Sequence, residues 1–432
     1  MASSQSTVAR TTFHLPFEIT IVILSRLPVK SLLRFKSVCK NWYDLIKTHD
    51  FVAKHLQTQS TINRTSLLVT GYNRETETHQ MSLLFNDGLI NGPINLDFAP
   101  FLNGRINKYT GMNYFYIVGI CNGLVCIHFS PDLYPLILCN PSTGQFREIP
   151  NSKWVWPDEM DFNVYGETVK RVSFGFGFHP SANDYKLIRI VLYFSYAGEP
   201  VIEADLYVMS TDTWREIHVD KVSVFFGEMN NFGRFTSYVQ IGESSASAVI
   251  NGVFYWPAFV IPSDEVIVMS FNMGDEVFRK IRTPVFLGRG FNETIWRFTK
   301  LTYQKIWQFT ELKDKLALVI HSNERCLDVW VLNEDQKSWT NQFKVGSFPR
   351  ISRYVRYGEN GEIRVVGCAN NGEFVVIDHS GSGDLKLFSY DLETCKRTDL
   401  YFGWVPYGSA IYLYTETLLP VMQTTEALNL CN

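Results

Sequence analysis

A hairpin pattern recurs through most of the chain after residue 60. An alternating apolar strand runs into a short polar turn, and a bulky residue, often followed by arginine and isoleucine, begins the next strand. The clearest copies occupy residues 136–149, 205–217 and 266–281, two looser copies occupy 327–340 and 385–397, and a more degenerate first copy occupies 66–85. Asparagine, aspartate and glycine fill the turns because they tolerate left-handed dihedrals. The repeat predicts antiparallel hairpins, each at the outer part of a sheet.

Asn-Gly pairs alternate with these hairpins and lead into apolar strands at 121–127, 250–256 and 371–376. We interpret these strands as inner strands of successive blades. The fold class expected for this region is therefore all-β, a β-propeller of about six blades, because radial repetition protects the edges of a long antiparallel chain. A stacked β-sandwich is the alternative.

Residues 15–56 have helical rather than strand periodicity. Ile19, Ile23 and Leu27 recur every four residues until Pro28 ends the first helix. Three further short helical segments follow, at 31–35, around Val38 to Ile46, and at 51–56. The segment carries more apolar surface than about 42 residues can bury alone. It either docks on a partner or packs as a small helical subdomain on the remaining chain.

The residue order of this segment resembles the F-box. The matching blocks are LPFEI at 15–19, ILSRLPVKSL at 23–32 and RFKSVCKNW at 34–42. The resemblance implies docking to a Skp-type adaptor, which tethers the chain to a cullin and a RING subunit in a ubiquitin ligase. We expect Leu15, Pro16, Ile19, Leu27, Pro28 and Leu32 to be exposed anchors. The full set of expected adaptor-binding residues is Leu15, Pro16, Ile19, Ile23, Leu27, Pro28, Leu32, Val38 and Trp42.

The β-rich region resembles the plant F-box-associated, kelch-like domain. The blocks that carry this likeness are CNGLV at 121–125, NPST at 140–143, FGFGF at 174–178 and NDYKLIRI at 183–190. Their order, with the ending at 411–421, is similar to S-locus F-box proteins and their relatives. We therefore expect a tail at 1–12, an F-box module at 13–57, a β-propeller-like domain at 62–425 and a second tail at 426–432. The resemblance implies a substrate receptor without catalytic activity of its own.

Other chemistries lack a signal in the sequence. The formal net charge of −3 argues against a nucleic-acid partner, and no run of 18 apolar residues could span a membrane. The eight cysteines form no C-x-x-C pair and are interpreted as buried thiols of a cytosolic or nuclear protein. Gly175-x-Gly177 lacks a third glycine, since Pro180 stands in its place, and the histidines show no metal-ligand spacing. No cofactor and no metal site are predicted.

Three aromatic and charged loops are the candidate substrate contacts, because long loops on a rigid scaffold often carry recognition. Basic targets would suit the acidic first loop. The candidates are Trp154, Trp156, Asp158, Glu159, Asp161, Phe226, Phe232, Arg234, Arg289 and Trp296. The S-locus likeness implies a ribonuclease as target, whereas a relative outside that group could recruit a signalling or immune protein. A propeller that binds a carbohydrate or small ligand is a third possibility.

Overall fold

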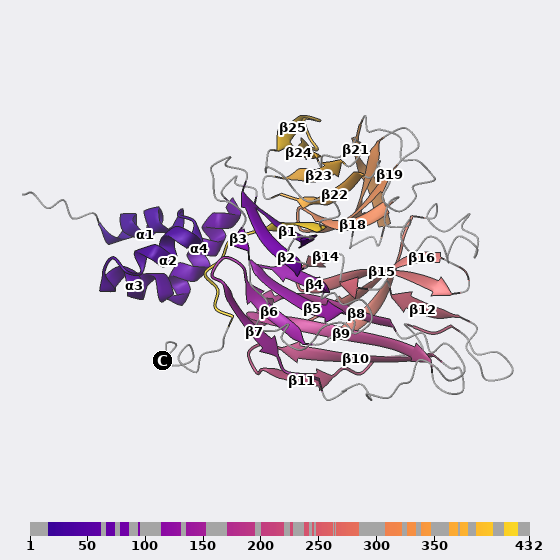
Figure 1. The fold of residues 1–432 in the computed structure, drawn as a ribbon. Coiled ribbons are helices and arrows are strands. Elements are labelled where there is room, and N and C mark those ends of the chain that lie inside the picture. The colour runs from indigo at the N-terminus through magenta and orange to yellow at the C-terminus, as the bar shows by residue number, and fades with distance from the viewer. Residues whose placement is uncertain are drawn as a thin grey trace, which may run out of the picture.

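The computed structural model contains a helical module attached to one end of a six-bladed β-propeller (Figure 1). The expected fold class is confirmed, and the sandwich alternative is wrong. The structure describes residues 16–61, 66–73, 78–85, 94–95, 114–130, 135–152, 171–194, 200–219, 225–227, 237–241, 244–245, 248–261, 263, 265–284, 307–321, 326–333, 338–346, 363–369, 372–378, 386–400 and 410–421.

Four helices form the N-terminal module: α1 (Phe17–Ser25), α2 (Val29–Phe35), α3 (Lys40–Lys47) and α4 (His49–Thr61). Pro28 precedes α2 as its N-cap, which explains why α1 and α2 are separate helices. Leu24, Leu32 and Ile46 lie in the core of this module. Two expectations were wrong in detail, because α4 is a full helix rather than a short turn, and Val38 lies in the turn before α3 instead of on its face.

Six antiparallel sheets form the blades of the propeller. From the inner to the outer strand, the first three blades are β26 (Ala410–Tyr414), β1 (Ser66–Asn73), β2 (Thr78–Phe85) and β3 (Ile94–Asn95); β4 (Tyr114–Cys121), β5 (Leu124–Ser130), β6 (Leu136–Asn140) and β7 (Gln145–Ile149); and β8 (Arg171–His179), β9 (Asp184–Phe194), β10 (Pro200–Val208) and β11 (Thr213–Glu216). A single 3₁₀ turn, Pro180–Ala182, joins β8 to β9.

The fourth blade has a divided inner strand. Its strands are β12 (Tyr238–Ile241) and β14 (Ala248–Ile250), then β15 (Val253–Ile261), β16 (Glu265–Asn272) and β17 (Val277–Arg282). β12 and β14 pair with opposite halves of β15. Between them, β13 (Ser244–Ser245) pairs in parallel with β8, so it links the third and fourth blades.

The last two blades are regular. They consist of β18 (Trp307–Leu312), β19 (Lys315–His321), β20 (Leu327–Asn333) and β21 (Ser338–Val345), and of β22 (Ile363–Cys368), β23 (Glu373–Asp378), β24 (Lys386–Asp391) and β25 (Arg397–Leu400). Inner strands of neighbouring blades lie next to each other, with β4 beside β8, β14 beside β8 and β18, and β22 beside β18 and β26. This contact order follows the chain around the ring.

The first blade closes the ring by joining the first and last strands of the propeller. β26 supplies its inner strand and pairs antiparallel with β1, in a register that places Leu68 opposite Tyr412. Both ends of the propeller segment therefore meet in one sheet. A closed ring removes the unpaired edge that an open array of blades would expose.

Five of the six predicted hairpins are confirmed as the outer pairs β6–β7, β10–β11, β16–β17, β20–β21 and β24–β25. The first predicted copy, 66–85, is a hairpin formed by β1 and β2, but it lies in the middle of its blade because β26 takes the inner position. The Asn-Gly pairs at 122–123 and 251–252 join inner strands as expected, whereas Asn371 of the third pair lies outside the described residues. Asn122 and Gly123, with φ of 51° and 76°, occupy the left-handed region that a type I′ turn requires.

The glycines of β8 make room for the next blade. A Cβ on Gly175 would lie 2.7 Å from Phe254 and 2.9 Å from Trp256, both fully buried in β15. The Trp256 indole N–H donates to the Phe174 carbonyl at 2.8 Å. The interpretation of this glycine pair as a strand that permits close approach is therefore confirmed, in place of a phosphate loop.

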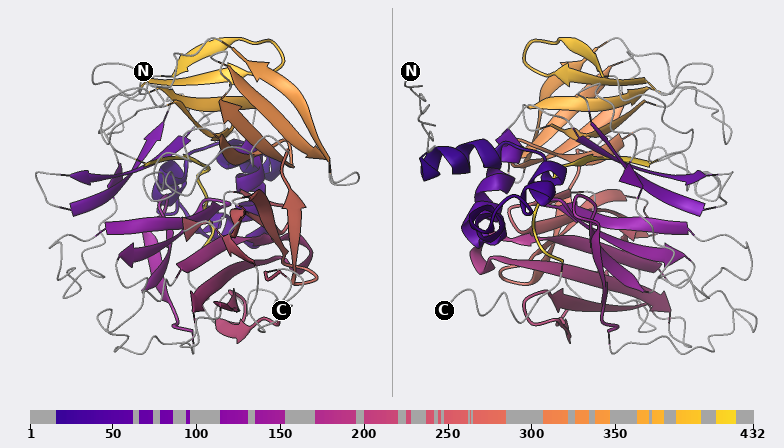
Figure 2. Two further views of the ribbon diagram at one scale, coloured as in Figure 1. Left: turned by 90° about the vertical axis from the view of Figure 1, so that its right-hand side faces the viewer. Right: turned by 60° about the vertical axis from the view of Figure 1, so that its left-hand side comes forward.

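The propeller has two unlike faces. In an antiparallel blade, the turn between the first two strands and the turn between the last two lie on one face. The helical module lies on this face, because β1 begins there directly after α4 and β26 ends there (Figure 2). On the opposite face, which we call the far face, one blade ends and the next begins. The ranges between such strands include 150–170, 217–237 and 283–306.

Candidate functional site

Exposed apolar side chains gather on the helical module. Eight large apolar side chains are exposed within the described part of the chain, and only Tyr116 and Val277 belong to the propeller. The other six are Phe17, Ile19, Val22, Ile23, Val38 and Tyr43, and we call them the apolar patch. Exposed apolar side chains concentrated in one small module indicate an interaction site, since it is favourable to remove them from water.

Most of the patch belongs to α1. The sequence of this helix, FEITIVILS, is apolar on nearly every side, and only Leu24 and Ser25 are buried. Ile19, Val22 and Ile23 stand three and four residues apart, so they share one helix face. The module therefore leaves one whole face of α1 without a partner in the described part of this chain.

The predicted adaptor-binding residues divide into three groups. Pro16, Ile19, Ile23 and Val38 are exposed, Leu27, Pro28 and Trp42 are half-buried, and Leu15 lies outside the described residues. The expectation of an exposed Leu32 is wrong, because this side chain is 0% exposed in the core of the module.

Sequence reasoning missed Phe17, Val22 and Tyr43 as exposed apolar residues. The spacing of Val22 relative to Ile19 and Ile23 was an available signal. Tyr43 is one turn before Lys47, whose ammonium donates to the tyrosine hydroxyl at 3.4 Å. No pattern in the sequence distinguishes the exposed Phe17 and Tyr43 from the buried Leu32.

The module that bears the patch also carries a net positive charge. Residues 16–61 contain seven lysines and arginines against three aspartates and glutamates, although the whole chain is slightly acidic. The pKa of Lys36 is lowered by partial burial and then by the charge of Lys47. An acidic partner surface would match this charge.

One candidate substrate contact is part of the propeller core. Phe226 is 6% exposed, forms an isolated bridge with Tyr238 and packs in the cluster that joins the third and fourth blades. Its assignment as a surface contact is therefore wrong, because a buried ring has no surface to offer. The other nine candidates, Trp154, Trp156, Asp158, Glu159, Asp161, Phe232, Arg234, Arg289 and Trp296, lie outside the described residues.

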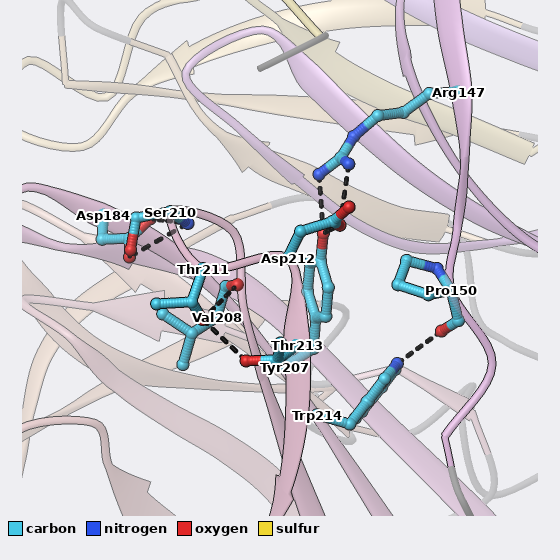
Figure 3. A network of polar contacts seen from close by, with 10 residues as sticks. All are labelled: Arg147, Pro150, Asp184, Tyr207, Val208, Ser210, Thr211, Asp212, Thr213 and Trp214. Carbon is cyan, nitrogen blue, oxygen red and sulfur yellow. Dashed lines mark hydrogen bonds and ion pairs between the residues drawn. The ribbon is translucent and has the colours of Figure 1, made fainter. Parts of the chain in front are cut away.

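Polar contacts join the second and third blades near their outer strands (Figure 3). The Arg147 guanidinium, from β7, donates to Asp212 at 2.9 Å and to the Tyr207 hydroxyl at 2.6 Å. Burial, followed by the hydrogen bond to Asp212, raises the pKa of Tyr207. The Trp214 indole donates to the Pro150 carbonyl at 2.6 Å.

The same type of contact recurs at the next blade interfaces. Arg215 pairs with Glu276 in the following blade, and the Trp339 indole donates to the Arg282 carbonyl at 2.8 Å. The aromatic residue and the arginine of the repeated hairpin thus connect neighbouring blades. Their role is structural, since each bonds to the protein itself.

A buried ion pair lies within the third blade. Arg189 and Asp205 form it between β9 and β10, with side chains 3% and 6% exposed. Ser152 donates to the same carboxylate at 3.2 Å. This arrangement satisfies charges that would otherwise be costly inside the protein.

No group of metal-binding side chains is found among the described residues, and no helix there is long and apolar enough to cross a membrane.

The cysteines differ in burial more than expected. Cys126 and Cys139 are buried, and desolvation raises the pKa of Cys139 to about 12. Cys39 and Cys395 are exposed, so the interpretation of every cysteine as a buried thiol is wrong.

The fold and the exposed helical surface together define a β-propeller protein with an N-terminal docking module. Comparison of the sequence with known families agrees with this class. The profile of the F-box domain matches residues 13–54, and that of the F-box associated beta propeller domain matches residues 103–403. The chain belongs to the F-box proteins with an F-box-associated β-propeller.

Relatives from Arabidopsis thaliana extend over most of the chain. An F-box/kelch-repeat protein is 28% identical over 348 residues, which are 79% of this chain and 82% of that protein. An F-box protein is 25% identical over 423 residues, covering 91% and 88% of the two chains. Among solved structures, oligopeptidase B from Leishmania major aligns over 84% of this chain and 55% of its own with 10% identity and a TM-score of 0.37, a likeness too weak to carry any inference.

Proposed function

We propose that this protein is the substrate-recognition subunit of an SCF-type ubiquitin ligase, in which the F-box binds a Skp-type adaptor. The observation that carries the proposal is the apolar patch on a module that the family profile identifies as an F-box. Through the adaptor, the chain would be held beside a cullin and a RING subunit. Its contribution would be proximity, which raises the effective concentration of a target lysine near the conjugating enzyme.

The adaptor interface is tested by placing charge on the exposed face of α1. We expect Ile19→Asp with Ile23→Asp to weaken binding of a purified Skp-type adaptor by at least about 30-fold, because apolar anchors in an interface each contribute on the order of 1–2 kcal/mol or more. Binding is measured by titration calorimetry on the full chain. The urea midpoint should change little, since both side chains are 47% exposed.

Val277→Asp is the matched control. It introduces one aspartate, against two in the double variant, at a propeller side chain that is 43% exposed, and adaptor affinity should be unchanged. Wild-type affinity in the Ile19/Ile23 variant would show that the adaptor binds elsewhere and would remove the main support for the proposal.

We further propose that the far face of the propeller captures a protein target. Connections between blades begin and end there, on the side opposite the F-box, and nine of the sequence candidates fall within those connections. A secreted-type ribonuclease is one target class, and a signalling or immune protein is another. Affinity capture from plant tissue under proteasome inhibition, with the Ile19/Ile23 variant as bait to prevent turnover, would identify the target.

A carbohydrate-binding propeller receives no support from the described part of the chain. A ring of exposed tryptophans around a pocket would favour it. The tryptophans whose side chains the structure describes are all half-buried or buried: Trp42, Trp214, Trp256, Trp330 and Trp339.

A further inference from the structure

An extended segment follows the last strand and passes between the F-box and the blades (Figure 2). We call residues 415–421 the strap. The strap belongs to no helix or strand, yet Glu416, Thr417, Leu418 and Val421 are buried. Buried irregular backbone must find hydrogen-bond partners outside regular structure.

Asn140, at the end of β6, supplies most of these partners. Its amide nitrogen donates to the carbonyls of Thr417 at 3.0 Å and Leu419 at 2.8 Å. Its amide oxygen accepts from the backbone N–H of Ser142 at 2.9 Å and of Thr143 at 3.3 Å. One fully buried side chain therefore closes its own turn and also holds the strap.

The Asn-Gly turn of the second blade provides the surface under the strap. A Cβ on Gly123 would collide with the Thr415 carbonyl oxygen and would lie 2.6 Å from a Thr417 methyl group. The Tyr414 hydroxyl donates to the Gly123 carbonyl at 3.0 Å and lies 2.8 Å from the Ser142 hydroxyl. The strap is thus seated directly on the backbone of the blade.

Side chains of the strap enter the cores of both modules. Leu418 is a member of the F-box core, where it joins residues such as Leu24 and Ile46. Val421 is 0% exposed in a propeller core that includes Leu136 and Ile149. Leu419 packs against both clusters. The F-box is therefore held at a second point besides its chain connection between α4 and β1.

We propose that the strap positions the F-box on the propeller, so that the adaptor-binding surface and the far face keep one fixed geometry. A single chain connection would permit rotation of the module, whereas insertion of Leu418 into its core prevents it. Transfer of ubiquitin to a captured protein depends on such a geometry, because effective concentration falls when two sites are free to separate. In this respect the inference rests on the proposed ligase function.

The test measures the distance between the two modules in the full chain. Nitroxide labels are attached to Cys39 in the F-box and Cys395 in the sixth blade, which are both exposed. The background carries replacements at the other cysteines that could react: Cys121→Ser, Cys326→Ser, Cys368→Ser and Cys431→Ser. Electron–electron resonance then gives the distance distribution with and without purified adaptor.

Asn140→Asp is the decisive variant, because it keeps the acceptor oxygen and shape of the side chain but removes both donors to the strap. We expect the width of the label-to-label distance distribution to increase about twofold or more, because the F-box would move from one position on the propeller to a range of positions. Leu418→Ser should broaden it in the same way through the F-box side. Pro420→Ala, at an exposed strap position, is the control and should leave it narrow.

Adaptor affinity is measured on the same samples and should change by less than about twofold in Asn140→Asp, since Asn140 belongs to the propeller and the apolar patch to the F-box. Retained affinity shows that the F-box is folded in the broadened variants. A distribution that stays narrow in Asn140→Asp, or one that is already broad in the wild type, would overturn the positioning role. Absence of adaptor binding in the wild type would instead contradict the proposed function. The distance distributions would still test whether the strap fixes the position of the F-box on the propeller.

Discussion

Single buried side chains show how this propeller depends on pH. The His128 ring stacks on Tyr116 and is tilted against Phe174, with ring centroids 5.4 and 5.6 Å away. Burial lowers its pKa to about 4, although the hydrogen bond to the Phe129 carbonyl opposes the shift. His79 has its pKa lowered to about 4 by the same cause. Its Nδ1 accepts the Phe115 N–H at 3.4 Å, which requires that nitrogen to carry no proton.

The two histidines predict loss of stability in mild acid. The unfolded chain takes up these protons near its ordinary pKa of 6.5, but the folded chain does so only near 4. Between these values the unfolded state binds more protons, so stability falls as pH falls, by up to about 1.4 kcal/mol per pH unit for each histidine. Urea unfolding between about pH 5 and pH 7 measures the slope.

His128→Gln removes one of the two titrating groups. The slope of unfolding free energy against pH should therefore fall by the contribution of His128. Most carboxylates titrate below this range, but burial raises the pKa of Glu311 to about 7, so this group contributes a slope of the opposite sign. Its contribution is the same in the wild type and in the variant, so the difference between the two slopes still reports His128. An unchanged slope in the variant would mean that His128 is protonated in the folded protein, contrary to its burial against aromatic rings.

At the level of single strands, β8 and β15 pack closely where the third blade meets the fourth. Gly175→Ala should destabilise the propeller by roughly 1–3 kcal/mol, the usual cost of overpacking a rigid core. The added methyl group would meet the rings of Phe254 and Trp256, and neither aromatic side chain has free space beside it. The shift of the urea midpoint at constant slope reports the loss.

Gly346→Ala is the matched control for this substitution. The nearest atom to its added Cβ is a cysteine sulfur at 3.8 Å, so the methyl group fits without strain. Its stability should stay within about 0.5 kcal/mol of the wild type, or rise slightly because the unfolded chain loses freedom. Equal effects of the two substitutions would contradict the packing argument.

Elements with local causes can be predicted from this sequence. The outer hairpins are such elements, because the turn residues and both strands are contiguous in the chain. The inner position of β26, the division between β12 and β14, and the middle position of the β1–β2 hairpin depend on pairing between distant segments. Turn chemistry contains no information about such pairing.

At the candidate site, too, the local sequence pattern could not predict which residues are buried. The order of residues identifies the F-box, but Ile19 and Leu32 are equally apolar, and only the packing of four helices buries one and exposes the other. Phe226 likewise has the composition of a recognition residue and the location of a core residue. Burial is a property of the assembled fold rather than of the local pattern.

At the scale of the whole molecule, closure of the ring should control cooperativity. Deleting residues 410–432 removes the inner strand of the first blade, including the buried Ile411 and Tyr414. We expect loss of the single cooperative urea transition and association through the edge of β1 that is left unpaired. Size-exclusion chromatography and urea unfolding measure the two effects.

A synthetic peptide of residues 410–421 should restore a monomer with cooperative unfolding by adding the missing strand to the sheet. Deletion of residues 422–432 alone is the control and should leave the transition unchanged. A truncated protein that unfolds like the wild type would show that the other five blades form a stable domain without closure.

The pairing of β1 with β26, which are the first and last strands of the propeller in the chain, has a consequence for biosynthesis. The F-box leaves the ribosome first, but the leucine that completes its core is residue 418, which follows roughly 20 to 70 s later at about 5–20 residues per second. Until then the ring is open and the docking module lacks part of its interior. Synthesis that stops before this residue therefore yields neither a closed propeller nor an F-box core that contains Leu418.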